Sequence, residues 1–159
     1  KIILNDNTSA IEDFTKAVIM EPNQAFAYVG RGNAKNNLFN YQGAIEDYSK
    51  AIEVDPTYSI AYYNRGNAKY YLFNYQGAIE DYSIAIDIDP TYSIAYYNRG
   101  NVKSDLEDNY GAIDDYSKAI EIDPNYAKAY SNRGIAKEKI GDIEGAKQDK
   151  NIYNSLIKR

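Results

Sequence analysis

Cysteine, histidine and tryptophan are all absent from this chain of 159 residues. Without cysteine the chain has no disulfides, no thiolate metal ligands and no cysteine nucleophile. Without histidine it lacks the residue that most often serves as a general acid, a general base or a metal ligand near neutral pH. We therefore expect no catalytic residue, no metal site and no cofactor, and we predict that the protein is not an enzyme.

Positive charge and long apolar runs are scarce as well. The net charge is −5 and the sequence pI is about 4.8. Because nucleic-acid affinity comes largely from lysine and arginine displacing counterions, nucleic acid is not an expected partner. No stretch approaches the roughly 20 apolar residues that span a bilayer, so a membrane is not an expected partner either. The sequence leaves the compartment open, with the cytoplasm slightly favoured.

Proline is rare but regularly placed, since the four prolines lie 34 residues apart, at Pro22, Pro56, Pro90 and Pro124. Segments aligned on these prolines agree at roughly two thirds of their positions, which indicates repeated copies of one structural unit. The period divides the chain into a partial first repeat (1–24), three full repeats (25–58, 59–92 and 93–126) and a final repeat with a capping helix (127–159).

Each full repeat has the pattern of two antiparallel helices. Small and apolar residues recur three, four and seven apart over 59–72 and over 76–88. Asn74 supplies turn chemistry between the two segments, and Asp89, which precedes a proline, ends the second helix. Thr91 is then the expected N-cap of the next helix. The same column reads Asn23, Thr57, Thr91 and Asn125. Helices this short are marginal alone, so the repeats must stabilise one another as a solenoid.

The repeated residues resemble those of the tetratricopeptide repeat family. The positions that carry the resemblance, quoted from one repeat, are Tyr62, Gly66, Ala78, Tyr82, Ala85 and Pro90. This resemblance implies an all-α fold, a right-handed superhelical solenoid of antiparallel helix pairs. The small residues would lie where two helices approach closely, with the tyrosine rings filling the space between them.

One departure from the family pattern is a charge at a packing position. The family's leucine column is arginine here, at Arg31, Arg65, Arg99 and Arg133, and an aspartate recurs as regularly, at Asp47, Asp81, Asp115 and Asp149. A charge at a packing position needs a partner, so we predict a ladder of arginine–aspartate pairs. The alternative is that the arginines extend to the surface and form only weak pairs.

The resemblance also implies that the first helix of each pair lines a concave groove. The stripe on that helix, Ile60, Tyr63, Asn67 and Tyr70, lies on one face. An asparagine amide matches a peptide unit, and tyrosine offers apolar area with a polar tip, so we predict a scaffold that binds protein or an extended peptide. The candidate residues are Asn33, Tyr63, Asn67, Tyr70, Tyr97, Asn98, Asn101 and Lys128.

Three alternatives to this assignment remain open. A subclass of the family binds the acidic tails of heat-shock chaperones through a clamp, which Asn67, Asn98 and Lys128 match here, but Tyr63 and Asn132 replace two of its three cations. An acidic tail is therefore not the expected ligand. The asparagine column could also serve contacts between helices. The second functional hypothesis is a structural unit that stacks end to end through an incomplete N-terminal face, forming a homo-oligomer.

Overall fold

The structure is a computed structural model that describes residues 2–158, and the chain divides into two compact units, with the boundary between Ile88 and Asp89. The described part of unit 1 contains α1 (Ile2–Met20), α2 (Ala25–Asn37), α3 (Tyr41–Val54), α4 (Ser59–Tyr71) and α5 (Tyr75–Ile88). The described part of unit 2 contains α6 (Ser93–Asp105), α7 (Asn109–Ile122), α8 (Ala127–Lys139) and α9 (Ile143–Leu156). Helices are the only regular elements of these described residues, as the predicted all-α class requires.

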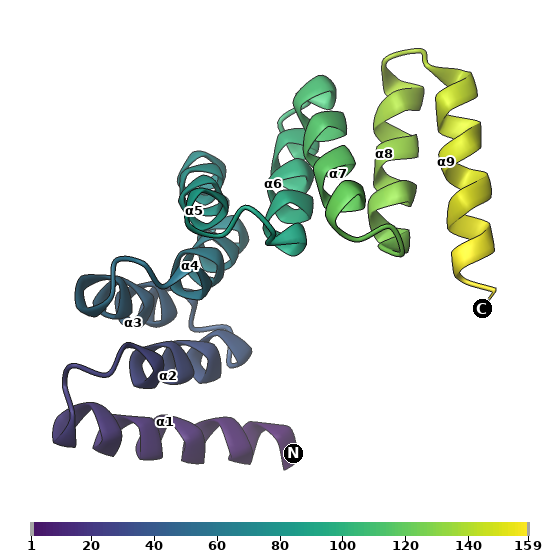
Figure 1. Cartoon of the computed structure of the whole chain (residues 1–159). Coiled ribbons are helices and arrows are strands. Elements are labelled where there is room, and N and C mark those ends of the chain that lie inside the picture. The colour runs from purple at the N-terminus through teal and green to yellow at the C-terminus, as the bar shows by residue number, and fades with distance from the viewer. Residues whose placement is uncertain (1, 159) are drawn as a thin grey trace. The chain divides into compact units, whose positions relative to one another are not determined.

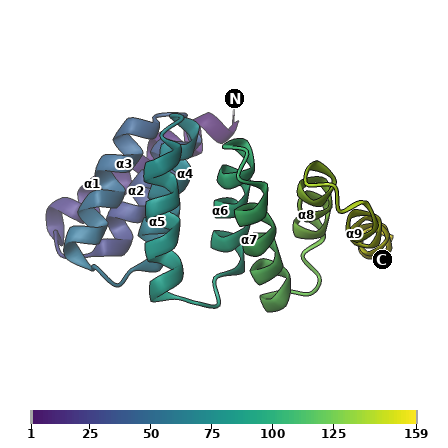
Figure 2. The same cartoon turned by 90° about the horizontal axis from the view of Figure 1, so that it is seen from above.

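Within each unit the helices pack in chain order. In unit 1, α2 lies against α3 and α4 against α5, while α1 packs on α2 and α3 on α4 (Figure 1). In unit 2, α6 lies against α7 and α8 against α9, and α7 packs on α8 (Figure 2). Turns of three residues join the two helices of each pair, so the partners run antiparallel. The predicted solenoid of antiparallel helix pairs is confirmed.

Small residues and tyrosines build the core between the helices. In unit 1, Tyr48 is 1% exposed among fully buried alanines of α3 and α4. Gly66 packs against the buried ring of Tyr82, where an added Cβ would lie only 2.8 Å from the ring. The close approach of α4 and α5 therefore requires glycine at this position.

The helix ends agree with the sequence expectations in part. As predicted, α5 ends directly before Asp89, and Asn74 has a turn role, because its Oδ1 accepts a hydrogen bond from the Gly77 N–H. The partial first repeat contributes one helix, α1, which spans 19 residues from Ile2 to Met20.

The predicted N-cap residues Asn23, Thr57, Thr91 and Asn125 are wrong by one position, since the caps are Gln24, Tyr58, Tyr92 and Tyr126. The reason is a turn at the preceding aspartate. The N–H and the hydroxyl of Thr57 both donate to Asp55 Oδ1, at 2.9 and 2.7 Å, so the threonine serves this turn instead of the helix.

Candidate functional site

Ion pairs between paired helices fix the frame that carries the candidate site. Arg65 Nε donates to Asp81 Oδ2 at 2.9 Å, and Arg65 Nη2 donates to Asp81 Oδ1 at 2.7 Å. The Asp81 side chain is only 2% exposed. The same pair recurs as Arg31–Asp47, Arg99–Asp115 and Arg133–Asp149. The predicted arginine–aspartate ladder is confirmed, and its carboxylates are buried.

A lysine completes each of these pairs as a second cation. Lys69 Nζ lies 2.8 Å from Asp81 Oδ2, and equivalent contacts join Lys35 to Asp47, Lys103 to Asp115 and Lys137 to Asp149. Arg65 also lies over the Tyr62 ring, at 5.6 Å from its centroid, and donates to Ser49 Oγ of the preceding repeat at 3.0 Å. We call each arginine–aspartate–lysine set a triad. The lysine was not predicted, although its position four residues after the arginine places both on one helix face.

In two of the triads, the pKa of one member is shifted toward its charged form. Burial alone would lower the pKa of Arg65, but the hydrogen bond and the charge of Asp81 outweigh burial and raise that pKa. Burial alone would raise the pKa of Asp149, but the hydrogen bonds and charges of Arg133 and Lys137 lower it. At both residues the ion pairing outweighs burial, and the triads hold the helices of a pair in a fixed register.

The candidate residues on the first helix of each pair form an asparagine face in each unit. The unit 1 asparagine face consists of Asn33, Tyr63, Asn64 and Asn67, and the unit 2 asparagine face consists of Tyr97, Asn98, Asn101 and Asn132. Asn64 and Asn132 were not among the predicted contact residues. Their recurrence with Asn98 at the 34-residue period was the signal that could have identified them.

In unit 1, two hydrogen bonds fix the carboxamide of Asn33. The Tyr48 hydroxyl donates to Asn33 Oδ1 at 2.8 Å, and Asn64 Nδ2 donates to the same oxygen at 3.0 Å. Burial, and then the charge of Asp47, raises the pKa of the Tyr48 hydroxyl, which keeps the proton that it donates. Among the described residues, Asn33 Nδ2 has no partner, and the Asn33 side chain is exposed. The Asn33 amide N–H groups are therefore held toward solvent.

Unit 2 repeats this arrangement at Asn101. The Tyr116 hydroxyl and Asn132 Nδ2 both donate to Asn101 Oδ1, each at 2.9 Å. Asn132 Nδ2 also donates to the Tyr97 hydroxyl at 3.1 Å. In unit 1 the Tyr82 hydroxyl donates to Asn67 Oδ1 at 2.7 Å, so three repeats share the bond from a buried tyrosine to an asparagine oxygen.

The predicted tyrosines differ in their surroundings. The Tyr63 ring lies 5.9 Å from the ring of buried Tyr82, on the asparagine face of α4. The Tyr70 ring packs instead against Tyr71 and Tyr75, each at 5.7 Å, near the turn that follows α4.

In unit 2, the Tyr97 ring packs against Tyr116 and Tyr126, at 5.8 and 4.9 Å. Asn98 is half-buried on α6, and Lys128 is exposed near the start of α8.

Among the predicted residues of unit 1, Asn33, Tyr63 and Asn67 lie on one face, and Tyr70 lies at the end of that face.

The described residues contain no group of three acidic side chains close enough together to hold a metal ion. The acidic pairs on the second helices divide their roles, because Asp81 is buried in a triad while Glu80 is exposed. Over residues 2–158, no helix has both the length and the apolar character needed to cross a membrane.

Sequence comparison identifies the repeat. A model described as tetratricopeptide repeat matches residues 59–92, and a second, described as TPR repeat, matches residues 40–72 and 105–141. Among curated proteins, none matches the chain significantly.

Solved structures show the same fold. A crystal structure of MamA has a TM-score of 0.91 and 28% identity, over 97% of this chain and 90% of that chain. The first TPR of Spaghetti (RPAP3), bound to the HSP90 peptide SRMEEVD, has a TM-score of 0.71 and 26% identity, over 73% of this chain and 92% of that one. PilF of Pseudomonas aeruginosa, with a TM-score of 0.88 and 19% identity over 96% of this chain and 69% of its own, shares the fold alone.

Proposed function

Because the chain belongs to the tetratricopeptide repeat family, we propose that it is a non-catalytic scaffold whose asparagine faces bind extended segments of partner proteins. This fold supports protein-interaction scaffolds, and proteins of the family are generally non-catalytic. The similar domain of RPAP3 is bound to a peptide, which is consistent with a peptide ligand here.

The fixed carboxamide of Asn33 is the observation that carries this proposal. Its oxygen already accepts two hydrogen bonds, from Tyr48 and Asn64, so the group left for a ligand is the Nδ2 donor. Asn101 is held in the same way by Tyr116 and Asn132. Each asparagine face thus offers an oriented donor to a backbone carbonyl, and a donor that is already oriented loses little entropy on binding.

The expected ligand is neutral rather than acidic. One arginine and one lysine of each first helix are engaged with a buried aspartate, as Arg65 and Lys69 are with Asp81. Tyr63 and Asn132 stand where the resemblance to the chaperone-binding subclass calls for cations, which leaves Lys128 as the cation at these positions. Without paired cations, charge-assisted bonds to a terminal carboxylate are lost. The peptide SRMEEVD should therefore bind more weakly than a neutral extended peptide.

Substitution of the two fixed asparagines by aspartate tests the proposal. Asn33→Asp and Asn101→Asp keep an oxygen that accepts from the tyrosine hydroxyl and replace the Nδ2 donor with a second oxygen. At about 1 kcal/mol for each net hydrogen bond, each change should weaken binding to its own asparagine face about fivefold, so the double variant should lose about fivefold at both faces. The matched control is Asn151→Asp, which makes the same charge change at an exposed position on α9.

The measurement is fluorescence anisotropy with the tightest neutral peptide from a peptide array, together with circular dichroism to verify folding. Unchanged affinity in the double variant, or an equal loss in Asn151→Asp, would show that the asparagine faces are not the binding surface. Light scattering over a wide concentration range tests the alternative of end-to-end stacking. That alternative requires a mass that rises with concentration and no peptide capture.

A further inference from the structure

Six aromatic rings form a continuous row along one edge of unit 1, which we call the aromatic edge. In order of contact they are Phe39, Tyr41, Tyr71, Tyr70, Tyr75 and Phe73. Successive ring centroids lie between 5.0 and 6.3 Å apart. The rings come from the turns that join α2 to α3 and α4 to α5 and from the helix ends beside these turns, away from the core tyrosines Tyr48 and Tyr82.

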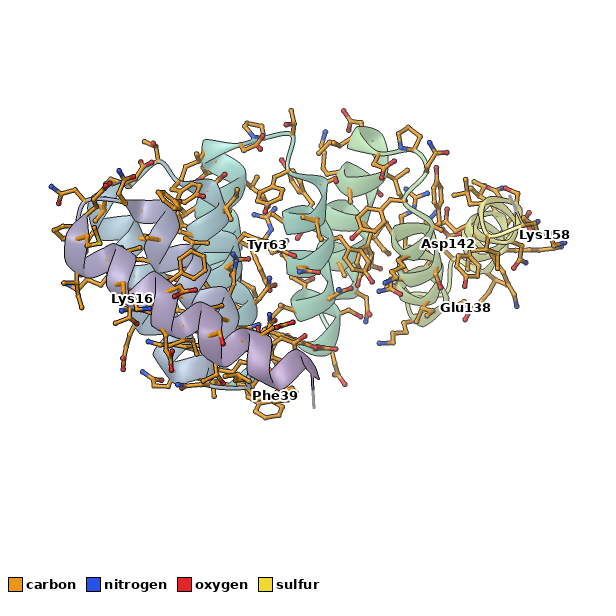
Figure 3. The ribbon with its side chains drawn as sticks, turned by 90° about the horizontal axis from the view of Figure 1, so that it is seen from below. Lys16, Phe39, Tyr63, Glu138, Asp142 and Lys158 are labelled. Atoms are coloured by element: carbon orange, nitrogen blue, oxygen red, sulfur yellow. The ribbon has the colours of Figure 1, made fainter. Side chains whose placement is uncertain are left out.

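The phenylalanines of the aromatic edge are exposed and strained. Phe39 and Phe73 are 76% and 78% exposed, and the Phe39 ring projects from the edge of unit 1 (Figure 3). Both have a left-handed backbone, with φ of 61° and 60°. The equivalent residue is Glu107 in the next repeat and Gly141 in the last, so the turn itself does not require an aromatic residue. Neither core packing nor turn geometry explains these two side chains, which favours a binding role.

The row contains the same right-angled corner twice. The Phe39 and Tyr41 rings meet at 80° with centroids 6.3 Å apart, and the Phe73 and Tyr75 rings meet at 80° with centroids 6.2 Å apart. Between the corners, Tyr71 stacks on Tyr41 at 5.0 Å and an interplanar angle of 15°. Two apolar corners of this kind, one repeat apart, form a surface with a regular spacing.

We propose that the aromatic edge binds a proline-rich segment in the polyproline II conformation, with one proline ring in each corner. Three ring contacts, with centroids 5.0, 5.7 and 5.7 Å apart, lead from Tyr41 in one corner to Tyr75 in the other. A polyproline II helix has three residues per turn and rises about 3.1 Å per residue, so its turns repeat about every 9 Å. A segment with proline at every third residue would therefore place equivalent rings in the two corners.

The absence of charge on the aromatic edge also favours a proline-rich ligand. Residues 36–43 and 70–79, which contain all six rings, include no charged residue. The polar side chains there are amides and tyrosine hydroxyls, which can donate hydrogen bonds to carbonyl oxygens. Prolines present carbonyls and lack the N–H, so a neutral proline-rich segment complements such a surface. Nucleic acid and anionic lipid are disfavoured, because Lys35 and Lys69 are engaged with buried aspartates.

A fluorescein-labelled ten-residue polyproline peptide is the probe, and a glycine–serine peptide of equal length is its control. Phe39→Gly and Phe73→Gly remove one ring from each corner and keep a residue suited to the left-handed backbone, as Gly141 shows. We expect saturable polyproline binding that weakens about fivefold in each single variant and about 25-fold in the double variant. Two control variants should leave it unchanged: Phe26→Ala, at an exposed aromatic residue near the start of α2, and Asn151→Asp, at an exposed position on α9.

Three results would overturn the proposal. The first is no binding of polyproline, or binding equal to that of the glycine–serine peptide. The second is unchanged polyproline affinity in the double variant when circular dichroism shows it folded. The third is a different occupant: a concentration-dependent mass that the double variant abolishes would assign the edge to a second copy of the chain. Binding to phosphatidylcholine vesicles that requires both phenylalanines would likewise assign the edge to a lipid surface.

Discussion

Replacing Arg65 by leucine measures how much one triad stabilises the fold. The substitution removes two hydrogen bonds to Asp81, at 2.9 and 2.7 Å, and the bond to Ser49. Removing one partner of a buried pair costs about 3–5 kcal/mol when the remaining charge is left alone. Lys69 still lies 2.8 Å from Asp81, so the loss in Arg65→Leu should be smaller, about 2–3 kcal/mol.

Further variants separate the two cations. Lys69→Leu alone should cost about 1.5–2 kcal/mol, because Arg65 still pairs with Asp81. The double variant should lose more than the sum of the two, by about 1 kcal/mol or more, since only then is the carboxylate without a cation. Adding Asp81→Leu should recover most of that loss, because an apolar group then replaces the stranded charge.

The assay is urea unfolding at pH 7, followed by far-ultraviolet circular dichroism. The matched control is Lys50→Leu, which breaks an exposed pair with Glu53 and should cost less than about 0.5 kcal/mol. If Arg65→Leu is no more destabilising than this control, or if Asp81→Leu fails to recover the stability of the double variant, the triads do not stabilise the fold.

Two further predictions concern acid stability and helix packing. The pKa of Asp149 is lowered in the folded state, so its contribution to stability is present above the unfolded pKa of about 3.9 and is lost as the pH falls through the folded pKa. Thermal unfolding between pH 7 and pH 3 should show a fall below about pH 4 that is shallower in Asp149→Asn. Gly66→Ala should cost about 1–3 kcal/mol in urea unfolding, because its Cβ would meet the Tyr82 ring at 2.8 Å. Gly134→Ala should cost less, since its nearest neighbour is at 3.3 Å and no ring faces it.

The features predicted correctly from the sequence are those that recur in every repeat, because each repeat provides the same signal again. The 34-residue period gave the helix pairs, and the parallel recurrence of arginine and aspartate columns gave the ladder. The lysines were not predicted, although Lys69 shares a helix face with Arg65. The N-cap error at Thr57 has a local cause, since the Asp55 turn competes for the same hydroxyl.

The aromatic edge was beyond sequence reasoning for two physical reasons. Tyr41 and Tyr71 stack although they are 30 residues apart, and only the packing of successive repeats brings them together. Phe39 and Phe73 adopt a left-handed backbone that residue preferences would assign to glycine or asparagine. The candidate residues on the asparagine faces remain predictions, although the structure adds a physical reason for Asn33 and Asn101 that the sequence did not contain.

Residues that stabilise the fold are the same in every repeat, whereas residues that give each repeat its own surface differ between repeats. The triad columns are identical in all four repeats, as each member depends on the other two. The column that begins with Phe39 instead changes to Glu107 and Gly141 while the backbone stays left-handed. The turn therefore folds with different side chains at this position. Folding does not explain why two repeats carry phenylalanine there, and a binding role does. Residues 104–110 carry three acids where unit 1 carries aromatic rings, and we therefore expect proline-rich ligands to bind unit 1 alone.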